Sequence, residues 1–247
     1  MVSLMNKIDA KILILVEGAK TDVKLMKHLL DIYGISRNHE VVSYNTNIYT
    51  LYKEMFADND PRSIDLLQLL KSKENNVQKK KIFDENYSDI LLIFDLDPQD
   101  NEFSASKILE MQSYFTESSD MGKLYINYPM VEAFYHLKSI PDNEYNERVV
   151  DMHELLNHSY KTRVNHENRN HDYTKFAINR KECNIIIKQN LSKGKIVSKN
   201  KTDDSVANML CILNVQLQEL VERKRLYVLC TCVYYIADYN SKLIDVE

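Results

Sequence analysis

Two apolar runs that end in acidic residues constrain the fold of this chain more than any other feature. The first, KILILV, covers residues 11–16 and is followed by Glu17. The second, DILLIFDLD, covers residues 89–97 and ends in Asp95 and Asp97. Continuous apolar runs of this kind are typical of strands that are buried on both faces of a parallel sheet. An acid directly after such a strand is poorly placed for packing, and well placed for chemistry at the edge of the sheet.

The order of the remaining patterns predicts an α/β fold with a mostly parallel, four-stranded sheet. Shorter apolar runs at 40–44 and 123–128 predict two further strands. Apolar residues recur at helical spacing between Thr21 and Tyr33, and Gly34 is expected to end that helix. Helices are also expected over 48–73, with a break at Asp60 and Pro61, and over 104–115. Strands that alternate with helices in this way indicate parallel pairing.

Beyond Pro129 the pattern becomes mainly helical. We therefore expect an α/β domain over residues 1–145 and a helical C-terminal region over residues 146–247. The helical patterns cover 130–137, 152–156, 173–190 and 203–223, with polar loops at 142–148 and 191–202. The late segments LCILNVQLQEL and LYVLCTCVYYIADY are either part of the core or the surface of a homodimer.

Charge is distributed unevenly along the chain, although the net charge is only −4. Residues 159–201 contain eleven Lys and Arg against three Asp and Glu, so this stretch carries +8 and the remainder carries −12. A basic region on an acidic body is typical of a protein that binds a polyanion. A solvated, lysine-rich helical surface would explain the same composition, so both interpretations stay open.

Hydropathy and cysteine usage predict a cytoplasmic protein that does not cross a membrane. No apolar run is long enough to span a bilayer, and the first residues lack the layout of a signal peptide. The four cysteines have no metal-ligand spacing, because Cys230 and Cys232 are separated by one residue and not by two. We expect free, mostly buried thiols in a reducing compartment.

The acids after the two strong strands would meet if these strands are neighbours in the sheet. Side chains alternate along an extended chain, so Asp95 and Asp97 would point to the same side. Three adjacent carboxylates with Glu17 need a cation or a shared proton, and oxygen ligands favour Mg²⁺ or Mn²⁺. Asp22 is either a further ligand or an acid that favours a helix N-terminus. Gly18 would allow a sharp turn and close approach of a phosphate.

The sequences ILILVEGAKTD and ILLIFDLD resemble the Toprim domain of topoisomerases, bacterial primases, recombination proteins and OLD-family nucleases. The resemblance covers roughly residues 10–128. It implies a Rossmann-like parallel sheet whose acids bind Mg²⁺ while phosphodiester bonds are made or broken. It further implies that Glu17 is a catalytic carboxylate and first metal ligand, and that Asp95 and Asp97 are the metal pair. Asp22 matches an acid that nuclease-type members often carry.

Several features of the larger Toprim proteins are missing from the sequence. We find no zinc module of primases, no recognisable topoisomerase tyrosine motif and no Walker-type phosphate loop. The chain therefore most resembles the small standalone Toprim proteins of bacterial anti-phage and abortive-infection loci. That resemblance implies a nuclease effector that acts beside a separate ABC-type ATPase.

The segment NYPMVEAFYHLK resembles an element of the same effectors in which an acid follows the fourth strand. Glu132 is therefore a candidate catalytic residue, and its alternative is an acid that interacts with a helix dipole. His136, one turn further, is either a proton shuttle or a packed or exposed histidine. Asp100 and Glu102 are either outer-shell metal ligands or ordinary loop acids. Lys20 either contacts a phosphate or is simply solvated.

The basic region would hold a nucleic-acid backbone beside such a site. Phosphate contacts position a strand without reading its sequence, and Tyr160 and Tyr173 could stack on unpaired bases. A surface for a partner protein is the alternative. The candidate nucleic-acid-binding residues are Lys161, Arg163, Arg169, Lys175, Arg180 and Lys181.

The leading hypothesis is a nuclease, dependent on Mg²⁺ or Mn²⁺, that cleaves DNA or RNA, tRNA included, as the toxic effector of an anti-phage system. Glu17, Asp95 and Asp97 would hold the ion, and Asp22 and Glu132 would complete the site. One alternative is a nucleotidyl or phosphoryl transferase, which would need a separate nucleotide pocket. The other is a non-catalytic subunit that acts with a partner ATPase.

Overall fold

The computed structural model describes residues 11–57, 60–119, 121–199 and 205–245. At its centre lies a four-stranded parallel sheet with the strand order β2-β1-β3-β4. The strands are β1 (Lys11–Val16), β2 (His39–Ser43), β3 (Tyr87–Asp95) and β4 (Lys123–Asn127). This sheet confirms the predicted α/β fold, and all four strands lie where the apolar runs predicted them to within a few residues.

The two strands with continuous apolar runs occupy the centre of the sheet. β1 pairs with both β2 and β3, and β3 pairs with both β1 and β4. Side chains from Leu13 to Val16 are fully buried, as are Leu92 and Phe94. Because helices cover both faces of a central parallel strand, no position on it can be polar without a cost.

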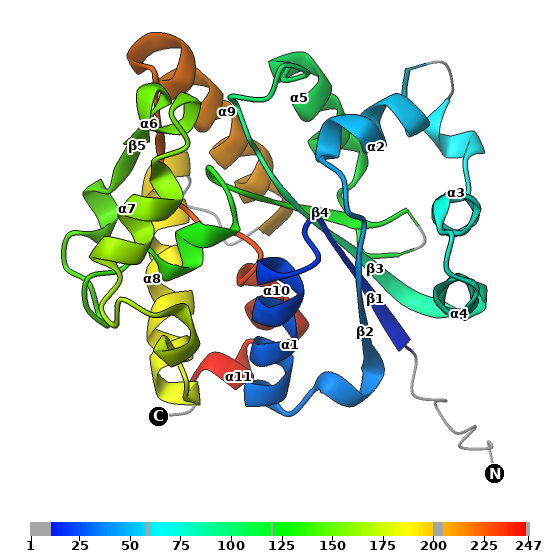
Figure 1. Cartoon of the computed structure of the whole chain (residues 1–247), viewed down its shortest axis with the longest axis horizontal. Coiled ribbons are helices and arrows are strands. Elements are labelled where there is room, and N and C mark those ends of the chain that lie inside the picture. The colour runs from blue at the N-terminus through cyan, green and yellow to red at the C-terminus, as the bar shows by residue number, and fades with distance from the viewer. Residues whose placement is uncertain (1–10, 58–59, 120, 200–204, 246–247) are drawn as a thin grey trace.

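Helices cover both faces of the sheet because the chain reverses direction across it. The connection from β1 to β2 runs in one direction across the sheet, and the connections from β2 to β3 and from β3 to β4 run in the other. Right-handed crossovers therefore place the helix of the first connection on one face and the helices of the later two on the opposite face. Figure 1 shows α1 (Thr21–Tyr33) and α10 (Tyr234–Tyr239) on one side, and α2 (Ile48–Met55) and α5 (Ala105–Tyr114) on the other. The shorter helices α3 (Leu66–Lys73) and α4 (Val77–Lys80) lie between β2 and β3 in the chain. Gly34 ends α1 with φ of 68°, as predicted.

The C-terminal region is mainly helical, but several predicted boundaries are wrong. α6 (Met152–Leu156) lies where it was expected, whereas α7 (Tyr160–Glu167) was not predicted. α8 (Arg180–Ser198) begins later and ends later than the predicted 173–190, so the loop expected from 191 is helical through Ser198. Tertiary packing explains this extension, since Gly194 lies against Tyr234 and Ile212. The helix expected over 130–137 is a short 3₁₀ helix, η4 (Val131–Tyr135), which follows a cis peptide bond at Pro129.

The remaining C-terminal elements are α9 (Ser205–Arg223) and α11 (Lys242–Asp245). The start of the predicted helix at Asp203, and Lys201 of the basic region, lie outside the described residues. Ile212 and Leu213 of α9 are fully buried, which favours a core role for the LCILNVQLQEL segment. A homodimer stays a prediction.

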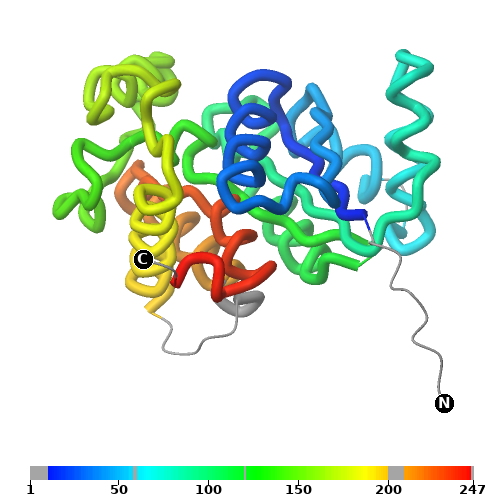
Figure 2. The backbone as a smooth tube through the Cα atoms, turned by 90° about the horizontal axis from the view of Figure 1, so that it is seen from below, coloured from blue at the N-terminus to red at the C-terminus, as the bar shows by residue number. Residues whose placement is uncertain are grey.

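The C-terminal region packs against the β4 edge of the sheet. β5 (Val149–Asp151) pairs antiparallel with β6 (Arg225–Tyr227), and Tyr128 and Leu229 exchange backbone hydrogen bonds of 2.8 Å. Thr231 Oγ1 donates to the Ile126 carbonyl at 2.7 Å. Figure 2 shows α8 in yellow and α9 in orange beside the red C-terminal segment. The predicted boundary near residue 145 is therefore crossed by many contacts, and separate domains stay a prediction.

Two smaller predictions concern membranes and cysteines. Within the described ranges, no helix has the length and apolar character that crossing a bilayer requires. All four cysteines are free, and Cys183, Cys230 and Cys232 are buried. The expectation of free, mostly buried thiols is confirmed.

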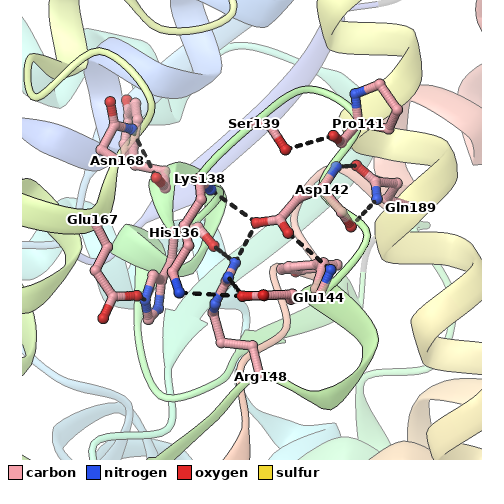
Figure 3. A network of polar contacts seen from close by, with 12 residues as sticks. His136, Lys138, Ser139, Pro141, Asp142, Glu144, Arg148, Glu167, Asn168 and Gln189 are labelled. Atoms are coloured by element: carbon pink, nitrogen blue, oxygen red, sulfur yellow. Dashed lines mark hydrogen bonds and ion pairs between the residues drawn. The ribbon is translucent and has the colours of Figure 1, made fainter.

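A buried ion pair organises the connection between η4 and β5. Arg148 Nη1 donates to Asp142 Oδ2 at 2.6 Å and to the His136 carbonyl at 2.8 Å (Figure 3). The carboxylate of Asp142 also accepts from the backbone N–H groups of Lys138 and Glu144. The side chains of the pair are each only 3% exposed. The polar segment 142–148, predicted as a loop, is therefore held at the edge of the core by hydrogen bonds of Asp142 and Arg148.

We predict that Arg148→Met lowers the free energy of unfolding by about 3–5 kcal/mol, because it leaves the Asp142 carboxylate buried without its counter-ion. Urea unfolding measures the change. The matched control is Lys138→Met in the same loop, whose ion pair with Glu144 has side chains that are 50% and 72% exposed. That control should cost less than about 1 kcal/mol. Equal losses in the two variants would contradict the role assigned to Arg148.

Candidate metal centre

Three acids meet at the carboxyl ends of β1 and β3. Glu17 follows the last residue of β1, Asp95 is the last residue of β3, and Asp97 lies two residues further. One carboxylate oxygen from each lies within 4.8 Å of the corresponding oxygens of the other two. The strands are direct neighbours, with Val16 opposite Ile93. The sheet therefore brings together the three acids that the sequence placed at its edge.

Asp97 reaches this cluster by a route that differs from the prediction. β3 ends at Asp95, and Asp97 has φ of 40°, which is left-handed and not extended. The N–H groups of Leu96 and Asp97 both donate to the Pro129 carbonyl, at 3.1 and 3.3 Å. Aspartate tolerates a left-handed backbone better than most residues. The Asp97 carboxylate is therefore directed into the cluster by a turn that hydrogen bonds to Pro129 hold, and not by the alternation of side chains along a strand.

Neighbouring polar groups fix the orientation of each acid. The Asp95 N–H donates to Glu17 Oε2 at 3.1 Å, and Asn127 Nδ2 donates to Asp95 Oδ1 at 3.3 Å. Gln99 Nε2 donates to Asp97 Oδ1 at 3.0 Å. Neither amide was predicted from the sequence. Asn127 ends β4 directly opposite Asp95, so a polar residue at the end of the neighbouring strand was the available signal.

All five predicted site acids line one cavity of about 310 Å³. Asp22 enters it from the first turn of α1, and Glu132 enters it from η4. Both are nearly buried, with 6% and 4% of the residue exposed. Gly18, Thr21, Gln99, His158 and Lys161 also contribute to the wall.

The position of Gly18 has a steric explanation. A Cβ atom at this residue would lie 2.5 Å from Asp22 Oδ2, so any larger residue would displace the Asp22 carboxylate. The nearby backbone N–H groups of Gly18 and of Asp22 itself partly offset the rise in the pKa of this carboxylate that burial causes. The glycine thus makes room for a second acid beside Glu17. Close approach of a phosphate to its backbone stays a prediction.

Burial and mutual repulsion raise the pKa values of the clustered acids. The pKa of Glu17 rises to about 8, because burial disfavours its carboxylate and the charge of Asp97 adds repulsion. Burial raises the pKa of Asp22 to about 6, with a contribution from Glu132. Burial also raises the pKa of Asp95 well above its ordinary value, and the Glu17 charge adds to the rise. Such a cluster holds its full negative charge only beside a cation.

Two carboxylate oxygens in the cavity lack a partner among the described residues. Asp22 Oδ1 and Glu132 Oε2 are buried and accept no hydrogen bond. Unpaired buried acceptors are costly in a folded protein. A hydrated divalent ion would supply partners for both, and an all-oxygen donor set suits Mg²⁺ or Mn²⁺. The residues present therefore fit the predicted ion, with Glu17, Asp95 and Asp97 as its ligands.

Lys161 extends from α7 across the mouth of the cavity. Its Nζ lies 3.1 Å from Glu132 Oε1, and its side chain is 64% exposed. Burial raises the pKa values of Glu17 and Asp97, and the charge of Lys161 partly opposes both rises. This lysine was predicted as a phosphate contact, but its position at the acidic cluster was not predicted, because α7 itself was not.

His136 holds α7 in place. It is fully buried, with Nδ1 at 3.2 Å from the Tyr160 hydroxyl and Nε2 at 3.1 Å from Glu167 Oε2. Burial lowers its pKa to about 3, so the imidazole is neutral near pH 7. His136 is therefore the packed histidine of the two predicted alternatives. Tyr160 is buried as well, so it cannot stack on a base.

The other predicted nucleic-acid-binding residues mostly bind within the chain. Arg163 pairs with Glu154 and Glu167, Arg169 with Glu182, and Lys175 with Asp172, while Arg180 donates to the Leu243 carbonyl and Lys181 is exposed on α8. Contact of these residues with nucleic acid stays a prediction.

The remaining candidate acids belong to the loop after β3. Asp100 accepts from the Asn47 side chain and from the N–H of Glu102. Glu102 pairs with Lys53. Neither acid lines the cavity, which favours the loop-acid alternative, and an outer-shell role stays a prediction.

Comparisons with protein-family models, with curated proteins and with solved structures found no match. The structure itself shows a four-stranded parallel sheet of α/β type that carries an acidic cluster able to hold a divalent ion.

We predict that the metal-free protein becomes less stable as the pH rises. The pKa of Glu17 is about 8 in the folded state against an ordinary 4.5, so the folded state binds the proton more tightly than the unfolded state. The contribution of Glu17 to the free energy of unfolding is therefore fully present below about pH 4.5, and it is lost as the pH rises through about 8. Glu17→Gln should stabilise the protein at about pH 8 by on the order of 2 kcal/mol, since the coupled acids share the protons.

Urea unfolding in EDTA at about pH 5 and pH 8 measures both effects. Glu85→Gln is the matched control, because Glu85 is an exposed acid paired with Lys11. It should change stability by less than about 1 kcal/mol at either pH. A Glu17→Gln protein that is less stable than wild type at the higher pH would contradict the repulsion described above.

Proposed function

We propose that this chain is a metal-dependent nuclease of the Toprim type. The observation that carries the proposal is the meeting of Glu17, Asp95 and Asp97 at the ends of two adjacent parallel strands. The order of the Glu-Gly and Asp-x-Asp motifs, each after a buried strand, supports the Toprim assignment. Unpaired oxygens of Asp22 and Glu132 in the same cavity support an ion with oxygen ligands.

Glu17, Asp95 and Asp97 would hold Mg²⁺ or Mn²⁺, which when bound neutralises phosphate charge and acidifies water. Glu132 is placed to accept a proton from a water that attacks the phosphorus, because its Oε2 is unpaired in the cavity. The water oxygen would bond to phosphorus while the leaving sugar oxygen departs and takes a proton from solvent. Lys161, bonded to the other Glu132 oxygen, would orient that carboxylate and attract a phosphate oxygen.

The biological role that we propose is that of a toxic effector in anti-phage defence. Its substrate would be DNA or RNA, tRNA included, and a separate ABC-type ATPase would control it. The absence of a Walker-type phosphate loop from the sequence supports a separate source of nucleotide control. The basic region, which begins at the mouth of the acidic cavity with Lys161, supports a polyanionic substrate.

The nuclease proposal is tested by incubating the purified chain with plasmid, single-stranded DNA and total tRNA, each in Mg²⁺, in Mn²⁺ and in EDTA. We expect cleavage that requires the metal and falls about 100-fold or more in Glu17→Gln. Glu102→Gln is the matched control, because Glu102 lies outside the cavity. Cleavage in EDTA, or full activity of Glu17→Gln, would refute the assigned site.

Metal binding has a separate readout. Mn²⁺ at about 100 times its dissociation constant should stabilise the wild type by about 2.7 kcal/mol in urea unfolding. It should not stabilise a chain that carries Asp95→Asn and Asp97→Asn. Stabilisation without turnover on any nucleic acid would favour the non-catalytic subunit over the nuclease.

We predict that Lys161→Met lowers the cleavage rate by about 100-fold, because it removes the cation placed beside the reacting phosphate. Lys79→Met is the control and should retain nearly all activity, because Lys79 is an exposed lysine of α4 outside the basic region. Urea unfolding should show less than about 1 kcal/mol of change in Lys79→Met, whose side chain is exposed. It should show a larger loss of stability in Lys161→Met, because the buried Glu132 carboxylate loses its cation. Equal rate losses in the two variants would mean that Lys161 acts only through the overall positive charge of the protein, and not through its position beside the acidic cavity.

A further inference from the structure

A second cavity, of about 450 Å³, adjoins the acidic one at the start of α1. Thr21, in the first turn of this helix, lines both cavities. One wall of the second cavity is formed by α1, and the other by η4 and the segment around η6 (Tyr173–Lys175). The lining residues besides Thr21 are Lys20, Lys24, His28, Tyr135, Tyr173, Thr174 and Phe176.

The wall opposite α1 is aromatic and tightly packed. The rings of Tyr135 and Tyr173 stack with centroids 4.3 Å apart and planes at 9°. Phe176 packs 5.8 Å from Tyr135, and these two residues are only 2% and 7% exposed. His28 Nε2 lies 2.8 Å from the Ala177 carbonyl, which ties this segment to α1. The cavity is therefore formed before any ligand arrives.

Cations lie at the α1 side of the same cavity. Lys20 and Lys24 are both exposed lining residues. Tyr173 is the partly exposed ring of this wall, and the buried rings of Tyr135 and Phe176 support it from behind. One accessible ring beside exposed lysines matches a ligand with a planar ring and a nearby anionic group. The volume also falls in the range of small-ligand sites, about 300–1,000 Å³. A nucleotide combines these properties.

We propose that this cavity binds an unpaired base of the polynucleotide whose phosphodiester bond lies at the acidic cavity. The proposal rests on the proposed nuclease function and names its substrate class. Because Thr21 lines both cavities, a base in the second and a phosphate in the first would belong to the same or adjoining nucleotides. A base inside a duplex stack cannot reach the aromatic wall. The substrate is therefore single-stranded at the cut, or has one base extruded there.

A polynucleotide fits this place better than a free nucleoside triphosphate. A triphosphate needs a cradle of backbone N–H groups, which glycine-rich loops provide. The chain has only four glycines, and Gly18, the glycine at the acidic cavity, faces the carboxylate of Asp22. The separate lysines of α1 suit single phosphates along a backbone. A nucleotidyl transferase, by contrast, would require the triphosphate to bind here.

The test measures binding without cleavage, in the Glu17→Gln background with EDTA. Fluorescence anisotropy would follow labelled single-stranded DNA and RNA oligonucleotides, their duplexes, and versions with one abasic position moved along the strand. Thr174→Trp should fill the cavity from an exposed lining position, and Tyr173→Ala should remove part of the wall. Tyr52→Ala is the matched control, because Tyr52 also stacks on a ring, that of Phe56, but belongs to α2.

We expect single strands to bind more tightly than duplexes. Thr174→Trp and Tyr173→Ala should each weaken binding of the single strand by roughly 5- to 100-fold, the range for loss of one stacked base. The abasic strands should show one position with a similar loss, and that loss should vanish in Thr174→Trp. Tyr52→Ala should leave the affinity unchanged.

Several outcomes would overturn the proposal. These are equal binding of duplex and single strand, a flat abasic scan, unchanged affinity in Thr174→Trp, or no binding of any oligonucleotide. Displacement of the oligonucleotide by micromolar ATP would also overturn it and assign the cavity to a free nucleotide. Because the readout is binding by an inactive variant, these results are distinct from failure of the nuclease assay. Active cleavage with unchanged Thr174→Trp binding would refute only the base site.

Discussion

The repulsion between buried carboxylates is the constraint on which the rest of this structure depends. Glu17 and Asp95 lie side by side because two central strands of a parallel sheet end together. The polar groups nearby offset only part of this cost, since the pKa of Glu17 still rises to about 8. Natural proteins retain such destabilising clusters mainly at functional sites, where a bound ion removes the repulsion. The edge of the sheet thus carries an acidic cluster that a bound cation would stabilise.

The C-terminal region supplies Lys161, the one lysine or arginine that lines the acidic cavity within the described part of the chain. Lys161 reaches Glu132 because α7 is bonded to the buried ring of His136. The carbonyl of His136 is in turn held by Arg148, which is paired with Asp142. A series of polar contacts therefore links the Asp142–Arg148 pair, through His136 and α7, to Lys161 at the acidic cavity. Removal of this helical region, although it is remote in sequence, is therefore expected to alter the site at the edge of the sheet.

The sequence predicted the sheet and the acids well because both follow from local rules. Buried central strands must be apolar throughout, and residues after them must meet at the same edge. The same rules could not predict that Asp97 depends on a left-handed turn held by Pro129. They also missed α7, because its short, polar sequence has little apolar periodicity, and tertiary contacts such as those of Tyr160 and Glu167 with His136 help to hold it. Tertiary contacts decide whether such short segments form helices, and the periodicity of the sequence does not reveal these contacts.

The two adjoining cavities suggest how one site could combine general chemistry with a choice of substrate. In the proposed nuclease, the acidic cavity would meet mainly phosphate oxygens, which are the same in every nucleotide, so it would not read the base sequence. The aromatic cavity, lined by Tyr135 and Tyr173 beyond Thr21, would in this proposal accept only a base that has left its stack. Selection would then rest on the availability of an unpaired base. The energy of unstacking would protect intact duplexes even though their phosphates fit the acidic cavity equally well.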